Sequence, residues 1–256
     1  MNYGICNLSA IPLRIEPNDR SEMVSQILFG EHFKVIDKSK QWRKVRLSFD
    51  KYEGWIDVKQ YLEITKEYYQ RLDKETTTVS SQLVDFISGK KNELIPIVLG
   101  STLPFLKNNR FKLAGKEYNF EGQVTAKKGT KNDIIKTTFL YSNTPYLWGG
   151  KTPFGIDCSG FTQMVYKING IRLLRDASQQ ASQGEVLSFI EESEPGDLAF
   201  FDNKEGEITH VGIIMANNYI IHASGQVRID RLDQSGIFNE KLKKHTHKLR
   251  VIKKIF

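Results

Sequence analysis

Short apolar runs separated by turn-forming residues fill the first 64 positions of the chain. They predict strands at 10–15, 23–29, 32–37, 42–47 and 53–57. The intervening segments are rich in Pro, Asn, Asp, Gly and Lys, which favour turns. Short strands at this regular spacing are typical of a small all-β barrel, which we predict for residues 1–64.

A polar stretch from Thr65 to Ser81 follows and is suited to a linking helix. Four more short apolar runs come after it and predict strands at 95–99, 102–106, 111–113 and 118–122. Their composition and spacing predict a second small barrel, with domain boundaries at 65 and 125.

The pattern changes at about residue 126, where helical periodicity appears. Helices are predicted at 133–141, 159–167 and 177–184, and strands at 197–201, 210–215, 219–223 and 249–256. Helices followed by a run of antiparallel strands are an α+β arrangement, which we expect for residues 126–256.

Cys158 lies where a glycine-rich loop ends and a helix begins. Apolar residues recur after it at helical spacing, at Phe161, Met164, Val165 and Ile168. The unpaired N–H groups of a helix start favour a thiolate, so the position predicts a nucleophile. The alternative is a small core residue, which is what we expect of Cys6 in its apolar strand.

A nucleophile of this kind needs a base, and two of the five histidines are placed to act together. His210 opens one apolar run and His222 closes the next, as in a β-hairpin. Side chains alternate along strands, so a two-residue turn would place the two imidazoles on opposite faces. A three-residue loop over 216–218 pairs Gly212 with His222 and brings them to one face, and we predict that loop.

Five motifs in this region together resemble the NlpC/P60 family of cysteine peptidases. They are Pro145 to Gly150, Asp157 to Phe161, Pro195 to Phe201, His210 to Ile213 and Ile221 to Ser224. The resemblance implies that Cys158 is the nucleophile, His210 its base and His222 the residue that orients the base. It also implies Tyr146 as an oxyanion donor beside the Cys158 N–H. A structural role for His222 is the alternative.

The front of the chain resembles a bacterial SH3 domain of the kind that precedes some members of this family. The resemblance rests on segments 12–17 and 21–31, on Trp42 and on segment 52–56. The expected fold class is therefore multidomain. Two small all-β SH3-like barrels, 1–64 and 65–125, precede an α+β papain-like NlpC/P60 domain, 126–256.

The resemblance implies a substrate as well. Such enzymes cut the γ-D-glutamyl bond to a diamino acid in murein peptides, and members with SH3 domains in front act in recycling on peptides with a free N-terminal L-Ala. Residues implied in substrate binding are Asp157, Ser159, Trp148, Ser178, Glu22 and Tyr52. The acids would bind the free amine. The alternatives are a helix cap for Asp157, exposed barrel surface for Glu22 and Tyr52, and loop packing for Tyr146 and Trp148.

The composition of the chain indicates where the protein acts and with which partners. The 256 residues include two cysteines and no stretch near the roughly 20 apolar residues of a membrane span, and the first residues do not read as a signal peptide. We expect a cytoplasmic monomer with a murein peptide as partner and neither nucleic acid nor membrane. A leader removed earlier would instead imply secretion. The net charge of +7 is densest at 241–254, where interleaved apolar residues favour a terminal strand over a nucleic-acid patch.

No cofactor or metal is expected. Gly149 and Gly150 do not match a phosphate-binding loop. His245 and His247 have no carboxylate or thiol residue near them in the sequence to complete a metal-binding motif. This favours a solvated or strand-edge role for both histidines. Three rival functions stay open: a secreted wall hydrolase anchored by its SH3 domains, a wall-binding module with an inactive peptidase domain, and a Cys–His acyltransferase.

Overall fold

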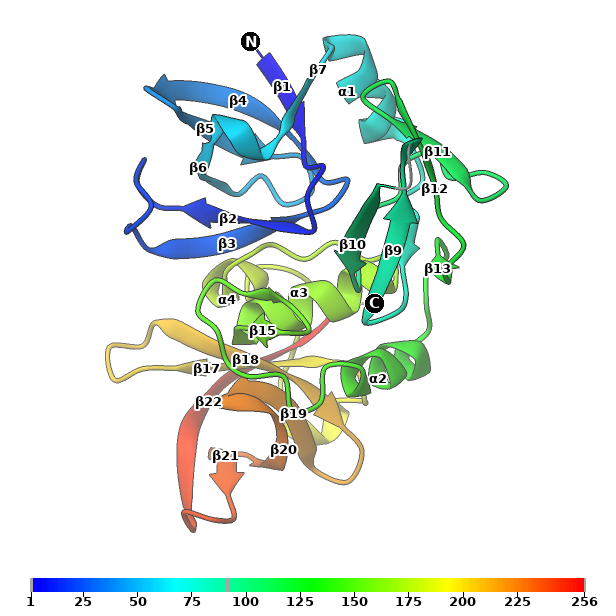
Figure 1. The fold of residues 1–256 in the computed structure, drawn as a ribbon. Coiled ribbons are helices and arrows are strands. Elements are labelled where there is room, and N and C mark those ends of the chain that lie inside the picture. The colour runs from blue at the N-terminus through cyan, green and yellow to red at the C-terminus, as the bar shows by residue number, and fades with distance from the viewer. Residues whose placement is uncertain (1, 91–92, 256) are drawn as a thin grey trace. The chain divides into compact units, whose positions relative to one another are not determined.

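The computed structural model describes residues 2–90 and 93–255 and divides into two compact units between Lys127 and Lys128 (Figure 1). Each unit is described by itself. Within the described residues, no helix is long and apolar enough to cross a membrane.

The first unit begins with a sheet whose strands follow the order β3-β2-β6-β5-β4-β1-β7. The elements are β1 (Asn2–Ile5), β2 (Ala10–Arg14), β3 (Met23–Leu28), β4 (His32–Ser39), β5 (Trp42–Leu47), β6 (Glu53–Asp57), the 3-10 turn η1 (Val58–Gln60) and β7 (Leu62–Ile64). The five predicted strands are confirmed with small changes of boundary. The two extra strands are short and pair with each other, and Cys6 is buried in the core beneath the sheet, as expected.

The rest of the first unit contains one helix and two small sheets. The elements are α1 (Lys66–Lys74), β8 (Val79–Ser80), β9 (Val84–Ser88), β10 (Leu94–Val98), β11 (Arg110–Leu113), β12 (Lys116–Asn119) and β13 (Val124–Thr125). One sheet has the order β10-β9-β12-β11, and β13 pairs with β8. The predicted strand 102–106 is wrong: Pro104 has no N–H to donate, and Phe105 has a φ of 57°, so the chain turns there.

The core of the second β region includes residues of the first. Phe29, which follows β3, is fully buried among Ile97, Leu103 and Phe111. Its carbonyl accepts the Thr102 N–H at 2.8 Å. Residues 65–125 therefore pack against the first β region through a core cluster that is separate from the interior of the first sheet.

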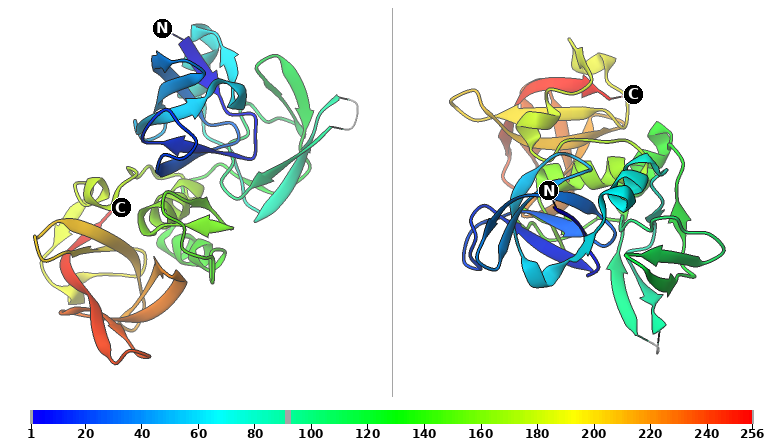
Figure 2. Two further views of the ribbon diagram at one scale, coloured as in Figure 1. Left: turned by 60° about the vertical axis from the view of Figure 1, so that its left-hand side comes forward. Right: turned by 90° about the horizontal axis from the view of Figure 1, so that it is seen from above.

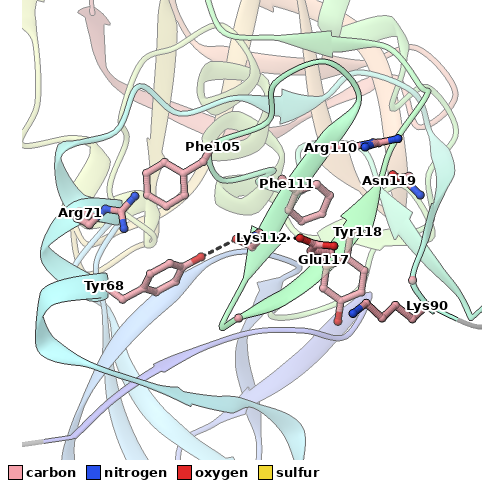
Figure 3. A pocket seen from close by; sticks show the side chains of 12 residues that line it. Tyr68, Arg71, Lys90, Phe105, Arg110, Phe111, Lys112, Glu117, Tyr118 and Asn119 are labelled. Atoms are coloured by element: carbon pink, nitrogen blue, oxygen red, sulfur yellow. Dashed lines mark hydrogen bonds and ion pairs between the residues drawn. The ribbon is translucent and has the colours of Figure 1, made fainter.

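A pocket of about 760 Å³ opens between α1 and the β11–β12 hairpin (Figure 3). Aromatic and basic side chains alternate around it: Tyr68, Phe105, Phe111, Tyr118, Arg71, Lys90, Arg110 and Lys112. The Tyr68 hydroxyl donates to the Lys112 carbonyl at 2.7 Å, and the Arg71 guanidinium lies 5.0 Å from the Phe105 ring centroid. These contacts tie the helix to the hairpin.

The second unit has its helices ahead of most of its strands, as predicted. The helices are α2 (Lys131–Phe139), α3 (Cys158–Ile168), α4 (Ala177–Gln180) and the 3-10 turn η3 (Ile190–Glu192). The strands are β14 (Lys151–Thr152), β15 (Gly155–Ile156), β16 (Glu185–Leu187), β17 (Leu198–Asp202), β18 (Ile208–Met215), β19 (Tyr219–Ser224), β20 (Gln226–Asp233), β21 (Gly236–Asn239) and β22 (Lys244–Lys254). The predicted helix 177–184 is shorter than expected because the chain leaves the helix for a turn that ends at Gly184, whose φ is +72°. Residue 256, the end of one predicted strand, lies outside the described residues.

The main sheet of this unit closes on itself. Its order is β16-β22-β17-β18-β19-β20-β21, and the first half of β22 also pairs with β21. Figure 2 shows the strands curling round until the last one meets both neighbours. α3 packs against β18 and β19 from outside this barrel. The C-terminal strand also lies beside residues 46 positions earlier in the chain, since Asp202 on β17 pairs with Lys248.

Phe29→Ala tests the shared core of the first unit. The change empties a fully buried aromatic site and should lower the free energy of unfolding by about 3–5 kcal/mol. Urea denaturation followed by circular dichroism measures it. Phe86→Ala, at a side chain that is 54% exposed on β9, is the control. Equal effects of the two changes would show that Phe29 does not join the two sheets.

Candidate active site

Cys158 is the first residue of α3, and the preceding loop is fixed to the helix start. Asp157 has extended backbone and caps the helix, its Oδ1 accepting the Gly160 N–H at 2.6 Å. A Cβ at Gly160 would lie 2.3 Å from the Gly150 carbonyl oxygen. Glycine at this position therefore lets the loop approach the helix closely.

The Asp157 carboxylate also holds a buried ion pair. The Arg175 guanidinium donates to both carboxylate oxygens, at 3.0 and 2.6 Å, and only 1% of Arg175 is exposed. The second carboxylate oxygen also accepts the Gly149 N–H at 2.8 Å, and Ser159 Oγ lies 3.3 Å from the first. Asp157 thus joins the loop, the helix start and the segment before α4. The sequence interpretation missed Arg175, whose side chain is among the largest that are fully buried.

The Cys158 thiol is protonated at rest. Burial raises the pKa of Cys158 to about 12, the nearby Asp157 carboxylate acts in the same direction, and a backbone hydrogen bond at Val211 acts against them. Burial thus opposes the thiolate that the helix start was expected to favour. A base must remove the proton. The thiol lies at the backbone of Val211, the residue after His210.

The histidine hairpin has the predicted register. Gly212 lies opposite His222 and Met215 opposite Tyr219, leaving a loop over 216–218. His210 Nε2 and His222 Nδ1 are 2.8 Å apart, so the two imidazoles share one hydrogen bond. A Cβ at Gly212 would lie 2.9 Å from the His222 Cβ, and the absence of that carbon makes room for the pair.

Asp230 extends this chain of hydrogen bonds. Its Oδ2 lies 3.0 Å from His222 Nε2, and the residue is buried. Since a carboxylate accepts, His222 carries its proton on Nε2 and presents a bare Nδ1 to the Nε2–H of His210. Asp230 was not predicted, although the alternation of residues 226–233 directly after Gly225 is a strand signal. It lies two residues from Arg228, the cross-strand partner of His222.

His210 is neutral in this setting. Burial lowers its pKa well below the usual range, and the neighbouring His222 and His247 add to the effect. Its Nε2 is engaged by His222, so Nδ1 is the nitrogen left to accept a proton.

His247 lies beside the pair, where the sequence predicted a solvated or strand-edge residue. Its ring stacks on His210 with centroids 4.2 Å apart and 26° between the planes. Barrel closure causes this, because His247 is on the part of β22 that pairs with β21. His245 behaves as expected: it is exposed and pairs with Asp233 at 2.8 Å.

The other predicted residues differ in position. Tyr146 is half-buried near the nucleophile, and burial, followed by the charges of Cys158 and Asp157, raises the pKa of its hydroxyl. Trp148 is 59% exposed, and Ser178 is exposed on α4. The Ser159 hydroxyl is buried and accepts from Arg175 at 2.9 Å. Glu22 and Tyr52 belong to the first unit, and their role in substrate binding stays a prediction.

Arg175→Ala should destabilise the second unit. It leaves the Asp157 charge buried without its partner, which costs about 3–5 kcal/mol. Urea denaturation measures the loss. Arg172→Ala, at an exposed position three residues earlier, is the control and should change the unfolding free energy by less than about 0.5 kcal/mol. A loss no larger than that of the control would contradict the structural role of the ion pair.

Asp230→Asn should slow alkylation of Cys158 by iodoacetamide about 10- to 100-fold at neutral pH. The amide removes the charged acceptor that fixes the His222 tautomer, and such a hydrogen bond contributes about 1.5–3 kcal/mol. Mass spectrometry of the labelled peptide gives the rate. Asp233→Asn breaks a similar aspartate–histidine contact outside the site and should leave the rate unchanged. An unchanged rate in Asp230→Asn would remove Asp230 from the site.

We next compared the chain with known protein families and solved structures. The model of the NlpC/P60 family matches residues 143–250, and that of the bacterial dipeptidyl-peptidase Sh3 domain matches residues 13–60. The crystal structure of an NlpC/P60 family protein from Bacillus cereus superposes with a TM-score of 0.83 over 99% of both chains, at 20% identity. It supports an SH3-like N-terminal region followed by an NlpC/P60 domain.

Two curated relatives align along most of their length. The γ-D-glutamyl-L-lysine dipeptidyl-peptidase of Bacillus subtilis is 32% identical over 216 residues, which are 78% of this chain and 71% of that protein. Dipeptidyl-peptidase 6 of Lysinibacillus sphaericus is 27% identical over 255 residues, covering 87% and 89%. With its thiol at a helix start, its histidine hairpin and these matches, the chain belongs to the NlpC/P60 family of cysteine peptidases.

Proposed function

We propose that the protein is a cysteine endopeptidase that hydrolyses the γ-D-glutamyl bond to an L-diamino acid in cell-wall peptides with a free N-terminal L-Ala. The observation that carries the chemistry is the buried chain from His210 through His222 to Asp230, next to the strand position that contacts the Cys158 thiol. The name of the Bacillus subtilis relative supports the bond.

The reaction begins with a proton transfer. His210 Nδ1 takes the thiol proton as the sulfur attacks the γ-glutamyl carbonyl carbon. The backbone N–H of Cys158 and the Tyr146 hydroxyl donate to the oxyanion of the tetrahedral intermediate. The His210 imidazolium then protonates the leaving amine of the diamino acid, and a thioester remains. Water, deprotonated by His210, attacks the thioester and releases the L-Ala-γ-D-Glu product with regeneration of the thiol.

His222 and Asp230 determine which nitrogen of His210 accepts the thiol proton. Asp230 accepts the Nε2–H of His222, and His222 Nδ1 accepts the Nε2–H of His210. This order leaves the lone pair of His210 on Nδ1, where the thiol proton goes. When His210 becomes charged, the buried carboxylate two steps away stabilises it.

Recognition of the free amine is assigned to Glu22 and Tyr52. Glu22 immediately precedes β3 and Tyr52 immediately precedes β6, and both strands pair with Arg14 near the end of β2. Asp157, the residue before the nucleophile, is assigned to the amine as well, and its carboxylate also caps α3 and pairs with Arg175.

We extend the proposal to recycling of freed peptides in the cytoplasm, as the resemblance to SH3-bearing members implies. A recycling enzyme acts on small peptides with an open L-Ala amine. A secreted wall hydrolase would instead act on intact sacculi, where that amine is blocked, and an acyltransferase would join the dipeptide to an added amine.

The test compares L-Ala-γ-D-Glu-L-Lys with its N-acetylated form and with purified sacculi. We expect L-Lys release from the free peptide and no release from sacculi. Cleavage of the acetylated peptide should be at least about a hundredfold slower, because the acids that bind the ammonium lose their partner. Chromatography with mass spectrometry measures all three. Cys158→Ala should abolish activity. Equal rates on both peptides would exclude amine recognition, and a transferred acyl group would identify an acyltransferase.

A further inference from the structure

Three imidazoles converge in the second unit. His210 on β18, His222 on β19 and His247 on β22 each offer one ligand nitrogen, and these three atoms lie within 4.8 Å of one another. His210 and His222 are buried and His247 is partly exposed, so the group is reached from the side of β22. The peptidase chemistry described above uses His210 and His222 and assigns no role to His247.

The hydrogen bonds around the cluster decide which nitrogens are available. His222 donates its Nε2–H to Asp230, which leaves Nδ1 bare. The Thr246 hydroxyl donates to the Ile237 carbonyl at 3.4 Å and accepts from His247 Nδ1 at 2.9 Å. The bare nitrogen of His247 is therefore Nε2. His210 Nε2 bears the single proton that lies between it and His222.

This arrangement matches the protein environment of a bound transition metal. A histidine ligand usually donates its second nitrogen to a carboxylate, hydroxyl or carbonyl that fixes its orientation, and Asp230 and Thr246 do so here. Three imidazoles and a water make a four-coordinate zinc site with Zn–N bonds of about 2.0–2.1 Å, hence nitrogens roughly 3.3 Å apart. The 2.8 Å between His210 and His222 must open by about 0.5 Å. The His247 ring must turn out of its stack on His210, and its nitrogen, which lies within 4.8 Å of the other two, must approach them by up to about 1.5 Å.

We propose that His210, His222 and His247 bind a divalent zinc-class cation that occupies the position of the shared proton and switches the enzyme off. On binding, His210 changes tautomer, its proton moving from Nε2 to Nδ1 through solvent so that the imidazole stays neutral, and the three nitrogens donate lone pairs to the cation. His210 and His222 are then ligands and no longer form the hydrogen-bonded pair. The inhibitory consequence rests on the proposed function, whereas cation binding does not.

Cation binding is measured without an activity assay, by titrating the metal-free protein with Co²⁺ and following its visible d–d absorption. We expect a single saturable site with the intensity of a four-coordinate ion. His247→Phe keeps a ring stacked on His210 and removes the nitrogen, and should weaken binding about 10- to 100-fold. His245→Phe, two residues away and paired with Asp233, should bind like the parent.

Cys158→Ala tests whether the metal is bound by the Cys158 thiol instead of by the three histidines. We expect Co²⁺ binding to persist in Cys158→Ala and to show no thiolate charge-transfer band in the parent. Binding that is lost in Cys158→Ala but kept in His247→Phe would assign the metal to the thiol and overturn the proposal, as would absence of saturable binding in the parent.

Inhibition is then measured as the ratio of peptide cleavage with and without Zn²⁺ for each variant. The parent and His245→Phe should be inhibited at the same Zn²⁺ concentration, and His247→Phe should need about 10- to 100-fold more. If the parent protein binds the cation and keeps full activity, the proposed inhibition is excluded, whereas the proposed cation site is not. Absence of cleavage by metal-free parent would contradict the proposed function and leave the Co²⁺ result intact.

Discussion

The carboxylate of Asp157 is the constraint on which the site depends. It binds a loop amide, a helix amide and the Arg175 guanidinium at once, and the proposed nucleophile, Cys158, is the next residue. A buried ion pair contributes little net stability, because desolvation offsets the attraction. Its value is positional: three segments distant in sequence are held against one another, and Cys158 takes the orientation that they define.

The same carboxylate is unfavourable for the reactivity of Cys158, and other residues of the domain compensate for this. A negative charge beside a buried thiol opposes formation of the thiolate, so reactivity cannot come from the helix start alone. The histidine chain supplies the base. Its two imidazoles are neutral at rest, which is compatible with their burial in a way that a preformed thiolate–imidazolium pair would not be. Charge then appears only during reaction, when Asp230 is already aligned to stabilise it.

Sequence reasoning succeeded where the determining interactions are local. Periodicity identified α3, the glycine-rich segment before Cys158 identified the start of that helix, and strand alternation with one odd residue gave the histidine register. It failed where distant segments meet. Arg175 reaches Asp157 from 18 positions away, and His247 reaches His210 only because β22 closes the barrel. The strand predicted at 102–106 failed for another reason, since Pro104 and the positive φ of Phe105 override its apolar composition.

The hairpin loop over 216–218 has a consequence for how this domain can diverge. It is exposed, and Asn217 and Asn218 both adopt left-handed backbone with φ near 60°, so its chemistry is barely constrained beyond residues that tolerate this conformation. Surface loops of this kind normally accept insertions and deletions. Here gain or loss of one residue would invert the face of every side chain on β19 and turn His222 away from His210. The sequence of this loop can therefore vary, but its length of three residues cannot change without moving His222 away from His210.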